Sequence, residues 1–141
     1  MVTYAKPALL AVKTDVQNLL AGATVAYDTN YIGPSATIAH APGSGVVTIT
    51  GAGLYSVTFN ADITATITGP ITVDIYNNGV IIPGAQTTFE ATLAEPVHIT
   101  LNTLIKVMKS CACADNTQNL QVKVSAAVGV INASIMVIKE A

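Results

Sequence analysis

Residues 53–63 decide the fold of this chain, and they read Gly53-Leu54-Tyr55-Ser56-Val57-Thr58-Phe59-Asn60-Ala61-Asp62-Ile63. After the glycine, apolar side chains stand at every second residue from Tyr55 to Ile63, and polar side chains stand between them from Ser56 to Asp62. Because successive side chains of a strand point to opposite faces, this run predicts one long β-strand with a buried face and a polar face. Such a strand is typical of the wall of a β-sandwich.

The same alternation recurs in three later segments: Ile71–Tyr76, Val97–Val107 and Leu120–Ala126. Turn-forming residues separate them, among which Asn77-Asn78-Gly79 predicts a tight hairpin, since Asn and Gly tolerate the positive φ that such turns need. About eight to ten short strands with regular turn signals predict an all-β fold, an antiparallel sandwich or jelly roll.

The first residues do not share this clear period. Residues 7–20 fit a helix through Leu9, Val12 and Val16, and they fit an extended arm equally well. We therefore divide the chain into an N-terminal segment, residues 1–22, that packs on neighbouring elements, and a jelly-roll domain, residues 23–141.

The last predicted strand, residues 130–138, is apolar on both faces. Its odd and even positions both carry large apolar side chains, so one face needs a second cover, and another subunit is the simplest one. From this pattern and from the strand before it, we select the candidates for a subunit interface: Leu101, Leu104, Ile131, Ile135 and Val137.

Composition excludes several classes of function. The 141 residues are 51% hydrophobic and only 10% charged, and the mean hydropathy is +0.55, so some apolar surface should be covered by partners. All six basic residues are lysines and the net charge is −2, which argues against nucleic-acid binding. The apolar run Ala8–Val12 is too short for a signal peptide, and no window approaches the roughly 20 apolar residues of a membrane span.

Chemistry-bearing side chains are few. Cys111 and Cys113 could point the same way from extended backbone, yet a structural zinc site needs about four ligands. The two thiols are therefore read as packing groups, with a local disulfide or a metal site as alternatives. His98 and His40 are read as solvated or interface residues, and Asp62 and Asp74 as surface groups that could pair across neighbouring strands or bind calcium. We expect no enzyme and no required cofactor.

The combined pattern resembles the superfamily of tumour necrosis factor and the globular head of complement component 1q. The residues that carry the resemblance are Gly53-x-Tyr55-x-Val57-x-Phe59, the run Asn78-Gly79-Val80-Ile81-Ile82-Pro83-Gly84-Ala85, and the apolar C-terminal strand. Bacterial and phage-encoded members are the most similar, because they also tend to carry a Cys-x-Cys before the penultimate strand.

This resemblance implies a jelly roll of roughly ten strands that forms a homotrimer. The expected function is a non-enzymatic structural or receptor-binding head of a phage or bacterial surface assembly, with a host surface receptor or glycan as partner. The alternative is a ligand- or metal-binding module that uses Cys111, Cys113 and His98. A virion or bacterial surface location is favoured, and no Gly-X-Y stalk or acidic calcium loop is found in the sequence.

Overall fold

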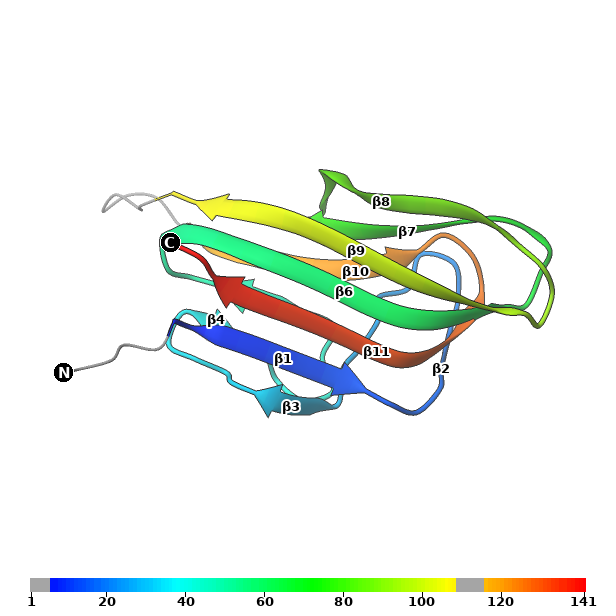
Figure 1. Cartoon of the computed structure of the whole chain (residues 1–141), viewed down its shortest axis with the longest axis horizontal. Coiled ribbons are helices and arrows are strands. Elements are labelled where there is room, and N and C mark those ends of the chain that lie inside the picture. Colours follow the sequence, from blue (N-terminus) through cyan, green and yellow to red (C-terminus); the bar gives the residue numbers. More distant parts are fainter. Residues whose placement is uncertain (1–5, 109–115) are drawn as a thin grey trace.

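The structure, a computed structural model, describes residues 6–108 and 116–141 and consists of two antiparallel sheets that face each other (Figure 1). Sheet A has the order β3-β1-β11-β6-β9, with β2 paired to β11, and sheet B has the order β4-β5-β10-β7-β8. The strands are β1 (Ala8–Lys13), β2 (Gln17–Leu19), β3 (Thr29–Ile32), β4 (Ile38–Ala39), β5 (Val47–Ile49), β6 (Gly53–Ala65), β7 (Gly69–Asn77), β8 (Val80–Ala91), β9 (Pro96–Val107), β10 (Gln118–Val124) and β11 (Val128–Lys139).

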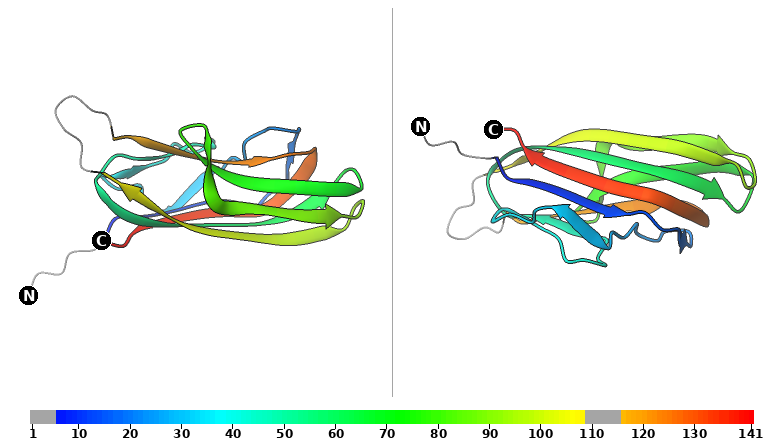
Figure 2. Two further views of the ribbon diagram at one scale, coloured as in Figure 1. Left: turned by 90° about the horizontal axis from the view of Figure 1, so that it is seen from above. Right: turned by 60° about the horizontal axis from the view of Figure 1, so that its bottom comes forward.

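The alternating stretch forms β6 as predicted, which lies in sheet A between β11 and the edge strand β9. Its apolar positions, among them Tyr55, Val57 and Phe59, are fully buried against the inner face of sheet B, whereas the polar positions between them are partly exposed. Figure 2 shows the two sheets as separate layers, and the buried apolar side chains of both layers form one hydrophobic core. The predicted all-β jelly roll is therefore confirmed.

The predicted hairpin is also confirmed. Asn78 and Gly79 connect β7 to β8 with φ values of 51° and 81°, the left-handed conformations that a two-residue turn requires. The segment 23–28, at the start of the predicted jelly-roll domain, is not a regular strand, and Thr24 forms an isolated bridge with Lys123. Its backbone bonds go instead to scattered partners, so that Tyr27 N–H donates to the Ser44 carbonyl and Gly43 N–H donates to the Tyr27 carbonyl.

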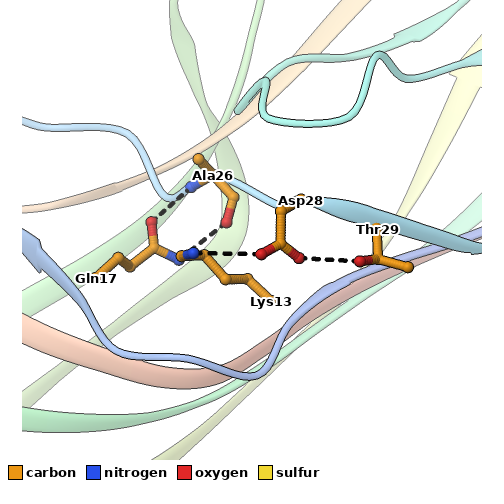
Figure 3. A network of polar contacts seen from close by, with 5 residues as sticks. All are labelled: Lys13, Gln17, Ala26, Asp28 and Thr29. Atoms are coloured by element: carbon orange, nitrogen blue, oxygen red, sulfur yellow. Dashed lines mark hydrogen bonds and ion pairs between the residues drawn. The ribbon is translucent and has the colours of Figure 1, made fainter.

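The N-terminal residues belong to the sandwich itself, which corrects the division at residue 22. Strand β1 lies between β3 and β11, and Leu9 and Ala11 are fully buried in the core. The Gln17 side chain binds both backbone groups of Ala26 at 2.9 Å, as Figure 3 shows, and so ties the β2 strand to a later part of the same chain. The segment packs on its own chain because β11 offers a long free edge to β1.

The same polar network includes an ion pair beside β1. Lys13 Nζ lies 3.3 Å from Asp28 Oδ2, and the Thr29 hydroxyl donates to Asp28 Oδ1 at 3.1 Å (Figure 3). The hydrogen bond from Thr29 is the main cause that lowers the pKa of Asp28; desolvation opposes this shift, and the hydrogen bond and charge of Lys13 support it. These contacts join the end of β1 to the start of β3.

A β-bulge explains why β11 is apolar at both odd and even positions. Ile131 lies opposite Asp62 and Ser134 lies opposite Asn60, so two residues of β11 face one residue of β6. Asn132 is the extra residue and has a φ of 54°. The bulge reverses the side-chain phase, and therefore residues on both sides of it point into the core: Val128, Val130, Ala133, Ile135 and Val137.

Candidate interaction surface

The outer face of sheet A, which points away from sheet B, carries an apolar band on β1 and β11. Leu10 lies opposite Met136, and Ala8 lies opposite Ile138, with none of these four side chains fully buried. Ile131 continues the band beyond the bulge and is 37% exposed, and Met136 is 36% exposed. We call these five residues the apolar band.

The other half of this face, on β6 and β9, is polar and internally bonded. The Thr58 hydroxyl donates to Asn102 Oδ1 at 2.9 Å, and the Thr100 hydroxyl donates to Asn60 Oδ1 at 2.8 Å. Each of these pairs joins residues that stand directly opposite each other in the register of the two strands. We call this set, together with the next pair, the polar ladder.

The last rung of the polar ladder is an ion pair. His98 Nδ1 lies 2.8 Å from Asp62 Oδ1, and the side chains are 62% and 41% exposed. The hydrogen bond from His98 lowers the pKa of Asp62; desolvation opposes this shift, and the Asn132 side chain and the charge of His98 support it. Sequence reasoning missed this pair because the two residues are far apart in the chain. The signal was present, since both stand at polar positions of the two longest alternating runs.

The polar ladder contains a hydroxyl, an imidazole and a carboxylate, which are the groups of a catalytic nucleophile, base and acid. Their hydrogen bonds, however, do not arrange them for catalysis. Thr100 Oγ1 lies 3.3 Å from His98 Nε2, and it donates its proton to Asn60 at the shorter distance of 2.8 Å. Because a hydroxyl has one proton, His98 does not act on the Thr100 proton in this arrangement. The ladder is thus a set of paired surface groups that stabilise the two strands.

A shallow groove runs along the edge where β8 of sheet B meets β9 of sheet A. Its volume is about 290 Å³, and exposed apolar side chains stand at its margin, Val80 at 69% and Leu104 at 60% exposure. A second hollow of about 440 Å³ adjoins this groove, and Leu54 and Met108 are among the residues that line it. The residues that line the edge groove are Asn77, Val80, Ile81, Ile82, Pro83, Leu104, Ile105 and Lys106.

The five predicted interface residues separate into two groups. Leu104 and Ile131 are exposed on the outside of sheet A, as an interface residue would be. In contrast, Leu101, Ile135 and Val137 are at most 5% exposed and lie in the core of the single chain. For these three the prediction is wrong, because strand alternation turns Leu101 inward and the bulge turns Ile135 and Val137 inward.

The prediction for His40 is also wrong, because this residue is buried and internally bonded. His40 is 5% exposed, its Nδ1 contacts the Asn30 side chain, and its Nε2 lies 2.8 Å from the Ser44 carbonyl oxygen. Its ring meets the Tyr27 ring edge to face at 5.9 Å between centroids. His40 therefore connects β3 to the loop before β5, beside a hollow of about 450 Å³ that its side chain helps to line.

The two aspartates cannot pair, since they stand on different sheets. Asp62 lies on β6 of sheet A, whereas Asp74 lies on β7 of sheet B and is 8% exposed. Within the described residues, Asp74 Oδ1 is buried without a hydrogen-bond partner. Cys111 and Cys113 lie outside the described residues.

Residues 6–108 and 116–141 lack two features that would indicate a metal site or a membrane-spanning helix. No group of three or more His, Cys, Asp and Glu side chains converges there in the manner of a metal site. These residues also contain no helix with the length and apolar character needed to cross a bilayer.

Solved structures with a similar fold are known, although the sequence itself has no match among family models or curated proteins. Among solved structures, the globular domain of zebrafish complement 1qA aligns with a TM-score of 0.66 at 9% identity, covering 96% of this chain and 98% of that chain. The Eiger TNF of S. frugiperda aligns with a TM-score of 0.64 at 12% identity, covering 98% and 94%.

A third similar structure is the vertex protein P5 of PRD1. It aligns with a TM-score of 0.59 at 12% identity and covers 99% of this chain and 100% of that chain. All three alignments cover at least 96% of this chain. The chain therefore has the jelly-roll fold of the complement 1q globular domain and the tumour necrosis factors.

Proposed function

We propose that this chain is a non-enzymatic head module that assembles as a homotrimer and serves as a structural or receptor-binding unit of a phage or bacterial surface assembly. The observation that carries the proposal is the pair of separate apolar surfaces on one chain, the apolar band on β1 and β11 and the edge groove between β8 and β9. The described residues, 6–108 and 116–141, leave both surfaces open.

Two different apolar surfaces favour a ring over a two-fold dimer. A two-fold contact uses the same patch on both partners, whereas a contact between different patches repeats around a rotation axis and closes a ring. The edge of one subunit, with Val80 and Leu104, then lies on the band of the next, with Met136 and Ile131. The number three comes from the resemblance to trimeric heads.

The polar ladder lies between these two surfaces and suits burial in such a contact. Its side chains are already bonded to each other, as in Thr58 with Asn102 and Asp62 with His98. A polar group that keeps its hydrogen bond is much less costly to bury than one that loses it. The ladder can therefore be covered by a neighbour without new partners.

The mass of the native particle tests the proposal. Light scattering should give the mass of three chains, and Met136→Asp should give single chains with unchanged circular dichroism, because it places a charge in an apolar contact. Ile67→Asp is the matched control, since Ile67 is 52% exposed in the loop between β6 and β7, away from both surfaces, and should leave the trimer intact. A monomeric wild type, or a trimeric Met136→Asp variant, contradicts the assignment.

A role in a virion or on a bacterial surface is supported by the fold likeness to a vertex protein, P5 of PRD1. A non-enzymatic role is supported by the polar ladder, whose hydroxyl proton is held by Asn60. A host receptor or glycan is the partner class that such a head would recognise. Binding of the purified chain to intact host cells, against a control cell that the assembly does not recognise, is the corresponding assay.

The metal-binding alternative remains a separate prediction that rests on Cys111 and Cys113. Its third ligand, His98, already bonds Asp62 through Nδ1 and contacts Thr100 through Nε2. Metal analysis and thiol titration of the purified chain test it directly. Bound metal that is lost on Cys113→Ser would favour this alternative, and two free thiols without metal would remove it.

A further inference from the structure

Four loops meet at the end of the sandwich that lies opposite the C-terminus (Figure 1). They contain residues 20–23, 65–69, 91–95 and 124–128, and hydrogen bonds join each loop to the next. Gly22 N–H donates to the Val124 carbonyl at 2.8 Å, and the Thr66 hydroxyl donates to the Ala127 carbonyl at 2.8 Å. Ala94 N–H donates to the Ala65 carbonyl at 3.1 Å, which joins the loop of residues 91–95 to the loop of residues 65–69.

Three of these loops expose a large apolar side chain. Leu20 is 77% exposed, Leu93 is 58% exposed, and Ile67 is 52% exposed. Each belongs to a different loop, and small or hydroxyl residues flank Ile67 and Leu93, such as Thr66 and Thr68 around Ile67. We call Leu20, Ile67 and Leu93 the distal tip.

The distal tip is not explained by folding. Turns are normally built from Gly, Pro, Asn, Asp and Ser, which supply the required backbone geometry and remain in contact with water. Single exposed apolar residues are common, but here three loops that are joined by hydrogen bonds at one end of the sandwich each expose one, and apolar exposure that gathers in one region marks interaction sites. The residues of the distal tip do not line the hollows at the β8–β9 edge or the hollow beside His40.

We propose that the distal tip inserts into the surface of a lipid bilayer. Separate apolar side chains on loops at one end of the sandwich suit a fluid partner that closes around each of them. A rigid protein partner would need about 800 Å² of contact on each side, roughly 20 to 30 residues, and three side chains fall far short of that. The inference deepens the proposed recognition role and rests on it.

Charge supports a neutral membrane over an anionic one. Residues 20–23, 65–69 and 91–94 contain no charged residue, so insertion desolvates no charge. Anionic membranes are recognised through clusters of Lys and Arg, and these loops supply none. The charged residue that follows directly is Glu95, which an anionic surface would repel. Binding should therefore favour zwitterionic lipid and should not weaken as salt rises.

Flotation of the full chain with phosphatidylcholine vesicles tests the proposal. The wild type should float with the vesicles, and Leu93→Ser and Ile67→Ser should each lower the bound fraction about tenfold, since each removes a partly buried apolar group from the contact. Tyr31→Ser is the matched control, because Tyr31 is 74% exposed on β3, outside the four loops and outside both proposed subunit surfaces, and should leave flotation unchanged.

Three results would overturn the proposal: a wild type that stays with the aqueous phase, binding only to vesicles rich in phosphatidylserine, or an equal loss in Tyr31→Ser. A chain that binds intact cells but not vesicles would instead favour a protein or glycan. Light scattering of the same samples separates this inference from the trimer. A monomer that floats contradicts only the trimer, and a trimer that does not float contradicts only the lipid contact.

Discussion

Two buried tyrosines differ in one respect that predicts opposite effects of the same substitution. Tyr27 and Tyr55 are both 0% exposed in the core. The Tyr55 hydroxyl donates to the Gly51 carbonyl at 2.8 Å. The Tyr27 hydroxyl, in contrast, is buried without a hydrogen-bond partner in the part of the chain that the structure describes. Tyr→Phe removes only this oxygen in each case.

The expected magnitudes follow from the two environments. Burying a hydroxyl without a partner costs about 1–3 kcal/mol, so Tyr27→Phe should raise the free energy of unfolding by about 1 kcal/mol. A buried neutral hydrogen bond contributes about 0.5–1.5 kcal/mol, so Tyr55→Phe should lower the free energy of unfolding by about 1 kcal/mol. The two variants should therefore differ by about 2 kcal/mol, with the wild type between them.

Urea unfolding measures this difference. The midpoint should rise for Tyr27→Phe and fall for Tyr55→Phe, and the slope of the free energy with urea should stay constant in all three proteins. A loss of more than about 0.5 kcal/mol in Tyr27→Phe would refute the reasoning, because it would mean that the hydroxyl has a partner such as an internal water molecule.

Alkaline pH provides a second readout on the same residue. Burial raises the pKa of Tyr27 far above its ordinary value of 10.0, so the folded protein keeps the phenol protonated where the unfolded chain ionises. The contribution of the protonated Tyr27 phenol to the free energy of unfolding is complete below pH 10. It is lost above pH 10, by about 1.4 kcal/mol per pH unit for this one group. Tyr27→Phe should show a correspondingly flatter decline of stability above pH 10, and an unchanged decline would exclude Tyr27 as its source.

Two further predictions concern the polar ladder and a close backbone approach. His98→Ala should raise the pKa of Asp62, because it removes the hydrogen bond that is the main cause of its lowered value; carboxylate titration by NMR measures this, and an unchanged pKa would contradict the pairing. Gly33→Ala should destabilise the chain more than Gly84→Ala. Both positions have a positive φ, but only at Gly33 would the methyl group meet a backbone atom, at 2.6 Å from the Ala8 carbonyl oxygen, and equal midpoints in urea would count against this steric reason.

The alternation of apolar and polar side chains was enough to predict several of the long strands of the sandwich. The alternation from Tyr55 to Ile63 predicted β6 and its buried face, and the same signal located β7, β9 and β10. The hairpin at Asn78-Gly79 was also readable, because its geometry depends on two adjacent residues. Each of these features is local, in that a strand or a tight turn shows its preference within a few residues of the chain.

The remaining features depended on which strands became neighbours. Strand β1 has no decisive period of its own and became a strand because β11 supplied a partner edge. The bulge at Asn132 turned Ile135 and Val137 into the core, and only the register against β6 reveals it. The pairing of His98 with Asp62 arose in the same way, across two strands that are distant in sequence.

The sequence by itself thus determined the all-β class, the sidedness of the long strands and the shortage of charged groups. The tertiary structure decided which apolar residues remain at the surface, namely Leu104, Ile131 and Met136 rather than Leu101, Ile135 and Val137. The physical reason is that side-chain alternation assigns two faces to a strand without saying which one is covered. That choice is made by register and bulges, since a shift of one residue exchanges the faces of an entire strand.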